Sequence, residues 1–288
     1  GLVVFAGSAF AEMRVDIPKS MKQGGVVKVF IGDKDSDEPY AVTFYDSKRH
    51  FTTFSLHLKE HVQIALIPIV VDEPAGNAEI CVFSTIINSK TCDEIAIEKV
   101  DFPESKRVFS VSKPTPAIWA RYQEERAFLD NLYALVTPKR YFSETLQFAN
   151  PLEKMEIVPN SDFGQIRKKV LVDPKTRKIA DRWKDYHKGA DFRASIGTPI
   201  FSAEDGKVVA ARNLLGSGNT VIVDHGQGLL SLYFHLSKIK VKEGQSVKRG
   251  DIIGLSGQSG NAQGPHLHFE IRLHQVPVNP FEFIGGVG

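Results

Sequence analysis

Two histidines, His266 and His268, lie in a run of residues whose apolar and polar members alternate as in a β-strand. Successive side chains of a strand point to opposite faces, so the apolar members can enter a core while the histidines share the other face with Glu270 and Arg272. Neutral imidazole binds metal ions and transfers protons near neutral pH, so this pair suits a metal ligand beside a proton-transfer group. By itself, the pair fits a solvated or structural pair of histidines equally well.

A histidine and a carboxylate lie further upstream. His187 and Asp191 are separated by a short segment with a glycine, so we expect the histidine to end a loop and the aspartate to begin a strand. His235 lies in a short aromatic-rich strand between the two groups. Zinc accepts N and O donors in a tetrahedral shell, and a catalytic site keeps three protein ligands and one open position. These residues supply three candidate ligands and two further histidines, but spacing leaves open which of His266 and His268 would contact the metal.

This ordered series resembles the zinc endopeptidases of the lysostaphin and LytM type, the M23 metallopeptidases. The resemblance covers roughly residues 150 to 285 and begins with His-x-x-x-Asp, an aromatic-x-His-Leu strand and His-x-His. Further elements typical of the family are Phe163-Gly164-x-x-Arg167, Gly197-Thr198-Pro199, Gly218-Asn219-x-Val221, Asp224-His225-Gly226, Arg249-Gly250-Asp251 and Val278-Asn279-Pro280. The resemblance therefore implies a LytM-type antiparallel β-sheet catalytic domain.

Carried over by position, the resemblance implies that His187, Asp191 and His268 bind Zn²⁺ and that His235 and His266 are the catalytic histidines. The implied reaction is the attack of a zinc-activated water on an amide carbonyl whose oxygen the metal polarises. The two histidines would orient or deprotonate that water, stabilise the developing oxyanion and protonate the leaving amine. The assignment of base and acid between them stays open.

The resemblance implies a zinc metalloendopeptidase that hydrolyses peptide crosslinks of bacterial cell-wall peptidoglycan. Crosslinks between stem peptides are the first expectation and glycine-rich bridges the second. One alternative is a non-catalytic LytM-like regulator of a wall amidase or a cell-division partner, and another is a zinc hydrolase of a different amide. Relatives of the regulatory kind lose metal ligands, whereas all five positions are filled here, which favours the enzyme.

Other polar residues near these motifs have simpler interpretations. His225 precedes Gly-Gln-Gly, a hairpin-turn composition, and we interpret it as a turn residue or as a partner that orients a ligand. Asn219 and Glu270 either hold a ligand imidazole or belong to a solvated strand face. The remaining histidines lack a carboxylate or cysteine at ligand spacing and are excluded from the site: His50, His57, His61 and His274.

Length and charge set limits on the class of protein. A chain of 288 residues can form two hydrophobic cores. Its 36 basic and 34 acidic residues give a net charge of +2, so the composition does not indicate a nucleic-acid partner. Basic clusters at residues 167–169 and 175–178 are interpreted as solvated, with a polyanionic wall polymer as the alternative partner. No apolar run approaches the roughly 20 residues of a membrane span.

The N-terminal residues indicate export to the periplasm, the cell envelope or the extracellular space. Residues 1–11 are apolar and end in Ala9-Phe10-Ala11, which resembles the end of a secretory signal peptide, although an edge strand at residues 2–6 is the alternative. Cys81 and Cys92 are the only cysteines and lie on two expected strands. In an exported protein such a pair favours a disulfide.

The order of the expected elements predicts a mainly β protein of two domains. Residues 12–112 contain short β-rich runs, spaced as in an antiparallel β-sandwich of immunoglobulin-like character. Residues 113–150 form a helical linker, with an amphipathic helix over 119–135 whose aromatic residues we expect in the core and a second short helix near 143–148. Residues 151–288 form the catalytic domain.

The role of residues 1–150 follows less directly from the residues. Latent relatives of the family block their zinc site with a preceding segment, so we expect residues 1–150 to inhibit the catalytic domain intramolecularly. The β-sandwich could instead bind or position a partner, or act as a spacer, because a fold alone does not give a function.

Overall fold

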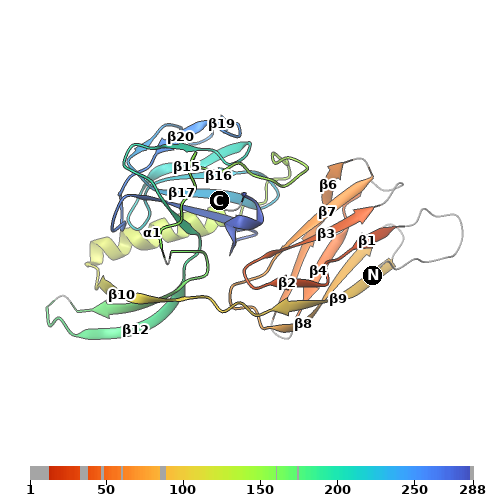
Figure 1. Ribbon diagram of the computed structural model, residues 1–288, viewed down its shortest axis with the longest axis horizontal. Helices are drawn as coiled ribbons and strands as arrows, with labels where there is room; N and C mark the ends of the chain where they lie inside the picture. Colours follow the sequence, from red (N-terminus) through yellow and green to blue (C-terminus); the bar gives the residue numbers. More distant parts are fainter. Residues whose placement is uncertain are drawn as a thin grey trace, which may run out of the picture. The chain divides into compact units, whose positions relative to one another are not determined.

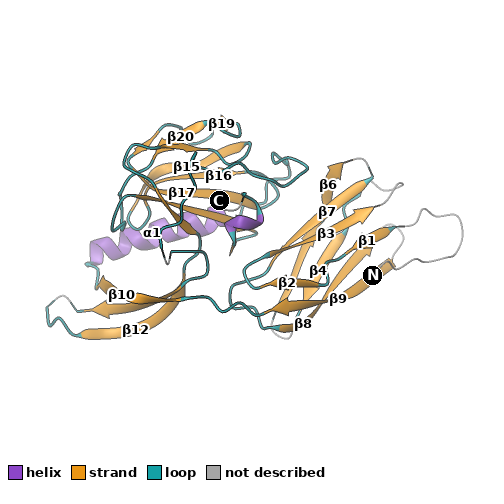
Figure 2. Ribbon diagram, in the orientation of Figure 1, coloured by secondary structure: helices purple, strands orange, loops and turns teal. Residues whose placement is uncertain are grey.

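Residues 13–32, 38–46, 49–59, 61–84, 89–159, 161–173 and 175–285 are described in the computed structural model of the chain. The chain divides into two compact units, Gly1–Asp101 and Phe102–Gly288. Strands make up most of the regular structure, and α1 (Pro116–Tyr133) is the one α-helix among the described residues (Figure 1, Figure 2). The expected mainly β fold is confirmed. The signal-peptide expectation for residues 1–11 lies outside the described residues.

The first unit is a sandwich of two sheets, as the alternation of its strands predicts. One sheet has the order β1-β3-β7-β6 and the other the order β2-β9-β8-β4-β5. Alternate residues of β3 and β8, such as Val29 and Ile80, are fully buried in one shared core. The strands are β1 (Arg14–Asp16), β2 (Ser20–Lys22), β3 (Val26–Gly32), β4 (Ala41–Tyr45), β5 (His50–Phe54), β6 (Leu56–Lys59), β7 (Val62–Pro68), β8 (Gly76–Ser84) and β9 (Ser89–Glu98).

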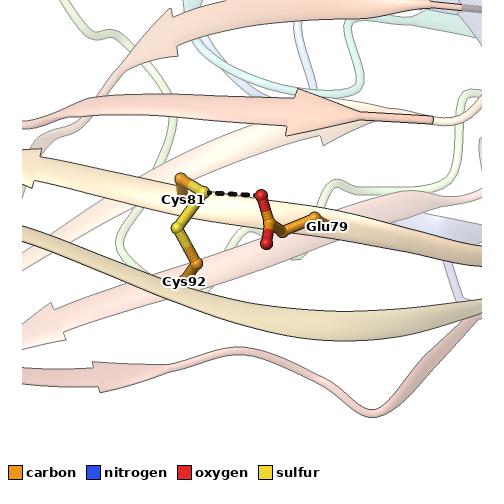
Figure 3. A group of neighbouring side chains, drawn as sticks. All are labelled: Glu79, Cys81 and Cys92. Carbon is orange, nitrogen blue, oxygen red and sulfur yellow. Dashed lines mark hydrogen bonds between the residues drawn. A yellow bond between two sulfur atoms is a disulfide. The ribbon is translucent and has the colours of Figure 1, made fainter.

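A disulfide joins the two strands that carry the cysteines. Cys81 and Cys92 lie directly opposite each other on β8 and β9, and their Cα atoms are 4.1 Å apart (Figure 3). The register of the two strands therefore brings the pair within bridging reach. Glu79 Oε2 lies 3.2 Å from Cys81 Sγ. Because the two sulfurs are bonded to each other, neither offers a thiolate to a metal ion, and this cluster is not a metal site.

The second unit contains a seven-stranded antiparallel sheet with the order β13-β21-β17-β16-β15-β19 and with β22 paired to β21. Two three-stranded sheets, β10-β11-β12 and β14-β20-β18, belong to the same unit. The strands are β10 (Glu104–Ser112), β11 (Ile166–Val172), β12 (Ile179–Tyr186), β13 (Ala190–Arg193), β14 (Pro199–Phe201), β15 (Gly206–Leu214), β16 (Gly218–Asp224), β17 (Leu229–Leu236), β18 (Lys238–Ile239), β19 (Ser246–Val247), β20 (Ile252–Leu255), β21 (His266–Leu273) and β22 (Val276–Val278), and a 3₁₀ turn follows at Pro280–Glu282.

The linker expectation is only partly right. Thr115 caps α1 at its N-terminus, and Phe128, Leu129, Leu132 and Tyr133 pack against apolar residues of β15, β16 and β17. The aromatics Trp119 and Tyr122 stack on each other but are 51% and 47% exposed, so the expectation that the helix aromatics are core residues is wrong for these two. The physical reason is that only the C-terminal half of α1 packs against the sheet.

The second short helix expected near residues 143–148 does not form. Leu146 has a φ of 54°, outside the range of a right-handed helix. The backbone N–H of Phe148 donates to the carbonyl oxygen of Phe283 at 2.8 Å, and Phe148 forms an isolated bridge with Ile284. The pairing with the end of the chain therefore replaces the local helix.

The compact units meet between Asp101 and Phe102, and the domain boundaries expected from the sequence stay a prediction. β10 pairs in parallel with β11, which places residues 104–112 in the second unit. None of the described helices combines the length and the apolar character that crossing a bilayer requires.

Candidate metal centre

Three side chains converge where β13 and β21 pair. Asp191 lies directly opposite His268 in the antiparallel register, and His187 follows the end of β12. His268 Nδ1 lies 2.8 Å from Asp191 Oδ1 and 3.0 Å from His187 Nε2, while His187 Nε2 lies 3.2 Å from Asp191 Oδ1. All three residues are buried. The structure thus brings together the three residues that the resemblance implies as zinc ligands.

A glycine makes this convergence possible. A Cβ atom on Gly189 would lie 2.3 Å from the carbonyl oxygen of Phe269 and 2.9 Å from His268 Nε2. Any side chain at position 189 would therefore push β13 away from β21. The glycine is needed for the close approach of two backbones, because its φ is not in the left-handed region.

The hydrogen bonds behind the two candidate histidine ligands turn their other ring nitrogens toward the cluster. His187 Nδ1 donates to the carbonyl oxygen of Asp162 at 3.0 Å, so Nε2 is the unprotonated nitrogen that faces the cluster. Glu270 Oε2 lies 3.4 Å from His268 Nε2 and likewise leaves Nδ1 to face it. Two nitrogens and one carboxylate oxygen aimed at one point are a donor set that zinc accepts, and outer carboxylate and carbonyl partners are usual for its histidine ligands.

The two oxygens of Asp191 are divided between different partners. Oδ2 accepts a short hydrogen bond from the Ser161 hydroxyl and another from Arg167 Nη2 at 3.1 Å. Oδ1 is the oxygen that faces the two imidazoles. Ser161 and Arg167 therefore fix the plane of the carboxylate and leave one oxygen for a metal ion.

The charges around the cluster favour a cation. Burial alone would lower the pKa of His268, but hydrogen bonds to Asp191 and Glu270 outweigh it and raise that pKa to about 9. Burial likewise works against ionised Asp191, yet its hydrogen bonds to the two histidines hold the pKa of this carboxyl well below the ordinary value. The position between His268 and Asp191 therefore attracts positive charge, which a divalent cation supplies.

The two remaining histidines lie beside the cluster. His266 Nε2 is 3.6 Å from Asp191 Oδ1, and the ring centroids of His235 and His266 are 4.8 Å apart. His235 Nδ1 donates to the carbonyl oxygen of Ser259 at 2.8 Å and His266 Nδ1 to that of Gly264 at 2.8 Å. Both rings therefore keep Nε2 as the proton-accepting atom.

His235 is held in an uncommon backbone conformation. Its φ is 62°, in the left-handed region that non-glycine residues rarely adopt, and its backbone N–H donates to the carbonyl oxygen of Ser217 at 2.9 Å. Burial, followed by the nearby His266 and His268, lowers the pKa of His235 to about 4. The imidazole is thus neutral at neutral pH and can accept a proton.

Comparison with known proteins identifies the family of this site. The model of peptidase family M23 matches residues 185–280. This range includes the three residues of the cluster and the two histidines beside it, His235 and His266. The chain carries an M23 peptidase domain. The resemblance inferred from the motifs is confirmed.

Curated relatives of the M23 domain include two peptidoglycan DD-endopeptidases of Vibrio cholerae. The chain is 47% identical to ShyA over 106 residues, which are 37% of this chain and 24% of ShyA. It is 45% identical to ShyB over 93 residues, which are 32% of this chain and 22% of ShyB. The match thus spans about a quarter of the length of these relatives.

A solved structure shares the fold over most of the chain. It is a crystal structure from Pseudomonas aeruginosa assigned to peptidase M23, with a TM-score of 0.64 and 24% sequence identity. The alignment covers 91% of this chain and 94% of that one. At this identity the likeness supports the fold of the M23 domain and of the preceding β-sandwich.

Within the M23 domain, His225 serves the turn after β16. Its Nδ1 donates to the carbonyl oxygen of Asp205 at 2.7 Å, and its Nε2 accepts from the Ser231 hydroxyl at 2.7 Å. Ser231 lies directly opposite Ile271, so the two side chains share one face of the sheet. Ile271 points away from the face that carries His268 and Glu270, so Ser231 lies on the face opposite the candidate ligands. The turn interpretation of His225 therefore fits, and its role as a ligand-orienting partner does not.

Stability should fall in acid because His225 stays neutral in the folded chain. Burial, the largest cause, lowers the pKa of His225 from 6.5 to about 4. Between these values the unfolded chain binds a proton that the folded chain does not. Stability present above pH 6.5 is therefore lost as the pH falls to about 4, by on the order of 3 kcal/mol. Urea unfolding at neutral and at acidic pH should show a larger loss for the wild type than for His225→Gln; equal losses would contradict this account.

The other polar residues near the motifs separate into two groups. Glu270 contacts a candidate ligand, as one of the two interpretations expects. Asn219 does not: its side-chain amide donates to the carbonyl oxygen of Leu236 at 2.9 Å and so holds the end of β17 beside His235. Of the excluded histidines, those whose side chains are described lie outside the candidate metal cluster: His50, His61 and His274.

Several residues that contact the candidate ligands had no predicted role. Arg167 lies in one of the motifs typical of the family, which is a signal for its importance but not for its contact with Asp191. Ser161 has no such signal, because a serine 30 residues from its partner fits any loop. Phe234 stacks on the His268 ring with centroids 5.1 Å apart, a contact that follows only from the register of β17 and β21.

Proposed function

We propose that the chain is a zinc-dependent endopeptidase that hydrolyses peptide crosslinks of bacterial peptidoglycan. The observation that carries this proposal is the buried cluster of His187, Asp191 and His268, whose inward lone pairs meet beside two further histidines. The names of the V. cholerae relatives support peptidoglycan as the substrate class. The same relatives support an exported protein of the cell envelope.

The residues of the cluster would hold zinc through His187 Nε2, Asp191 Oδ1 and His268 Nδ1. Zinc there would supply a Lewis acid that polarises the scissile carbonyl and acidifies a water molecule. His235 can take the proton of the attacking water at Nε2, because its Nδ1 donates to the carbonyl oxygen of Ser259 and leaves Nε2 as the accepting nitrogen. His266 can act as the acid when Nε2 carries a proton: protonated there, beside Asp191 Oδ1, it would hydrogen-bond the developing oxyanion and give that proton to the leaving amine, and the proton taken by His235 would replace it.

A non-catalytic regulator remains the second candidate, but no feature of the site favours it. That function would tolerate the loss of a ligand, whereas His187, Asp191 and His268 keep their donor atoms close together and His235 and His266 lie beside them.

The proposal includes intramolecular inhibition, but by the first compact unit alone and not by all of residues 1–150. α1 packs on the same face of the sheet that carries the histidines, since Leu232 in its contact cluster pairs with Glu270. Removing α1 would expose that apolar surface, so a shortened chain beginning at residue 151 is a poor test. Comparison of the full chain with the compact unit Phe102–Gly288 isolates the effect of the first unit. Faster hydrolysis by the shorter chain is the expected result.

Purified peptidoglycan sacculi provide the direct test of the function. The full chain loaded with zinc should release fragments whose mass spectra show new peptide termini at the crosslinks. A chelator should abolish the release and added zinc should restore it. Intact sacculi after incubation with a protein shown to contain zinc would reject the endopeptidase and favour the regulator or a different amide substrate.

A further inference from the structure

The helix α1 reaches the outer partners of the candidate metal site, although it lies outside the residues that the M23 family model matches. Alternate residues of β21 share one face, so Arg272 follows His268 and Glu270 along the strand on the same side. The last residue of α1 is Tyr133, and its ring lies over the guanidinium of Arg272 with a distance of 3.8 Å from Cζ to the ring centroid.

A continuous series of contacts leads from this ring to the metal ligands. Arg272 Nε donates to Glu270 Oε1 at 2.5 Å, and Glu270 Oε2 lies 3.4 Å from His268 Nε2. His268 Nδ1 in turn faces Asp191 Oδ1 at 2.8 Å. A second nitrogen of Arg272 donates to the carbonyl oxygen of Gln275 at 2.9 Å. Two nitrogens of the guanidinium are thus hydrogen-bonded to Glu270 and Gln275, and the Tyr133 ring of α1 covers one of its faces.

We propose that Tyr133 is a positioning residue for the candidate metal site, which holds the His268 imidazole in place through Arg272 and Glu270. The proposal rests on the proposed function only in assuming that His268 binds zinc. It makes α1 part of the candidate site, although the helix precedes the residues that the M23 family model matches.

The burial of the Glu270–Arg272 pair explains how the Tyr133 ring can hold it in place. Glu270 is 2% exposed and Arg272 is 8% exposed, so the buried carboxylate needs a compensating charge, and Arg272 supplies one through its Nε hydrogen bond at 2.5 Å. An aromatic face over the guanidinium attracts the cation and excludes water from it. Without the ring, the long arginine side chain gains rotamers and solvent, and Glu270 can turn away from His268.

The same helix contains a matched control. Phe128 lies over the guanidinium of Arg212 at 3.9 Å and packs in the same apolar cluster as Tyr133. Arg212, however, pairs with Glu243 at the exposed edge of the sheet, with Nη2 2.8 Å from Oε2. Replacing Phe128 therefore removes an equivalent ring–guanidinium contact of the same helix without touching the partners of His268.

The test measures zinc affinity and steady-state hydrolysis in the full chain. Zinc affinity is measured by competition with a chromophoric chelator, and kcat and KM are measured on peptidoglycan fragments. The variants are Tyr133→Leu, Tyr133→Met as a second ring-free variant, Tyr133→Phe, which keeps the ring, and Phe128→Leu. The ring-free variants should bind zinc about tenfold more weakly, the low end of the effect of removing an outer partner. Tyr133→Phe and Phe128→Leu should stay within about twofold of the wild type.

Each outcome is decisive. Weaker zinc binding in the ring-free variants, rescued by phenylalanine and absent in Phe128→Leu, supports the proposal. An equal loss in Phe128→Leu, or no loss in Tyr133→Leu and Tyr133→Met, overturns it and leaves Tyr133 as a packing residue. A wild-type chain that binds zinc but leaves peptidoglycan intact would reject the proposed function. The zinc affinities of the Tyr133 variants would still test the role of Tyr133 in that case.

Discussion

Alanine at Asp191 or His268 is expected to remove both zinc and hydrolysis, whereas alanine at His235 or His266 is expected to remove hydrolysis alone. The first pair supplies two of the three donor atoms that meet in the cluster, and three protein ligands are the usual minimum of a catalytic zinc site. The second pair turns Nδ1 toward backbone carbonyl groups and lies beside the cluster. Loss of a proton-transfer group typically lowers the rate by about 10²–10⁴-fold.

Zinc content after dialysis, together with release of peptides from sacculi, checks this division. His50→Ala is a suitable control, because His50 is an exposed residue of the first unit that stacks on Tyr45. His266→Ala is the most informative variant, since His266 Nε2 lies only 3.6 Å from a ligand oxygen. Equal loss of zinc from all four variants would overturn the assignment of ligands and catalytic histidines.

The five residues of the candidate site could be predicted as candidates, because each lies in a short local pattern that resembles a motif of the M23 family. His187 and Asp191 are four positions apart, and His266 and His268 are two positions apart on an alternating strand. Local patterns also predicted several strands of the first unit and the strands that carry His235 and His268, since period-two alternation reflects burial of one face. These signals need no knowledge of how distant segments pair.

The residues that hold the ligands could not be predicted in the same way. Tyr133 reaches Arg272 across 139 positions, and Ser161 reaches Asp191 across 30. Such contacts depend on the register of β13 and β21 and on where α1 crosses the sheet. A pattern within one segment carries no information about either. The burial of Trp119 was mispredicted for the same reason. Helical periodicity predicted a buried face along the whole helix, but the sheet covers only half of it and Trp119 is exposed.

Gly189→Ala is expected to weaken zinc binding strongly, although it changes neither a ligand nor a charge. The added methyl would lie 2.3 Å from the carbonyl oxygen of Phe269, a backbone atom that cannot rotate away, and 2.9 Å from His268 Nε2. Relief requires β13 to move from β21 and so breaks the pairing that sets Asp191 opposite His268. Overpacking of this kind typically costs about 1–3 kcal/mol of stability. The displaced carboxylate should reduce zinc affinity by more than about tenfold, since even outer partners cost that much.

Gly264→Ala provides the matched control for this effect. Gly264 lies two residues before His266, and its carbonyl oxygen accepts a hydrogen bond from His266 Nδ1. A Cβ atom at position 264 would have no other atom within 4 Å. An alanine keeps that carbonyl group, so zinc affinity and thermal stability should match the wild type. Chelator competition and thermal unfolding of both variants separate a steric effect at position 189 from a general intolerance of alanine near the site. Wild-type zinc affinity in Gly189→Ala would show that the close approach of β13 and β21 does not set the geometry of the ligands.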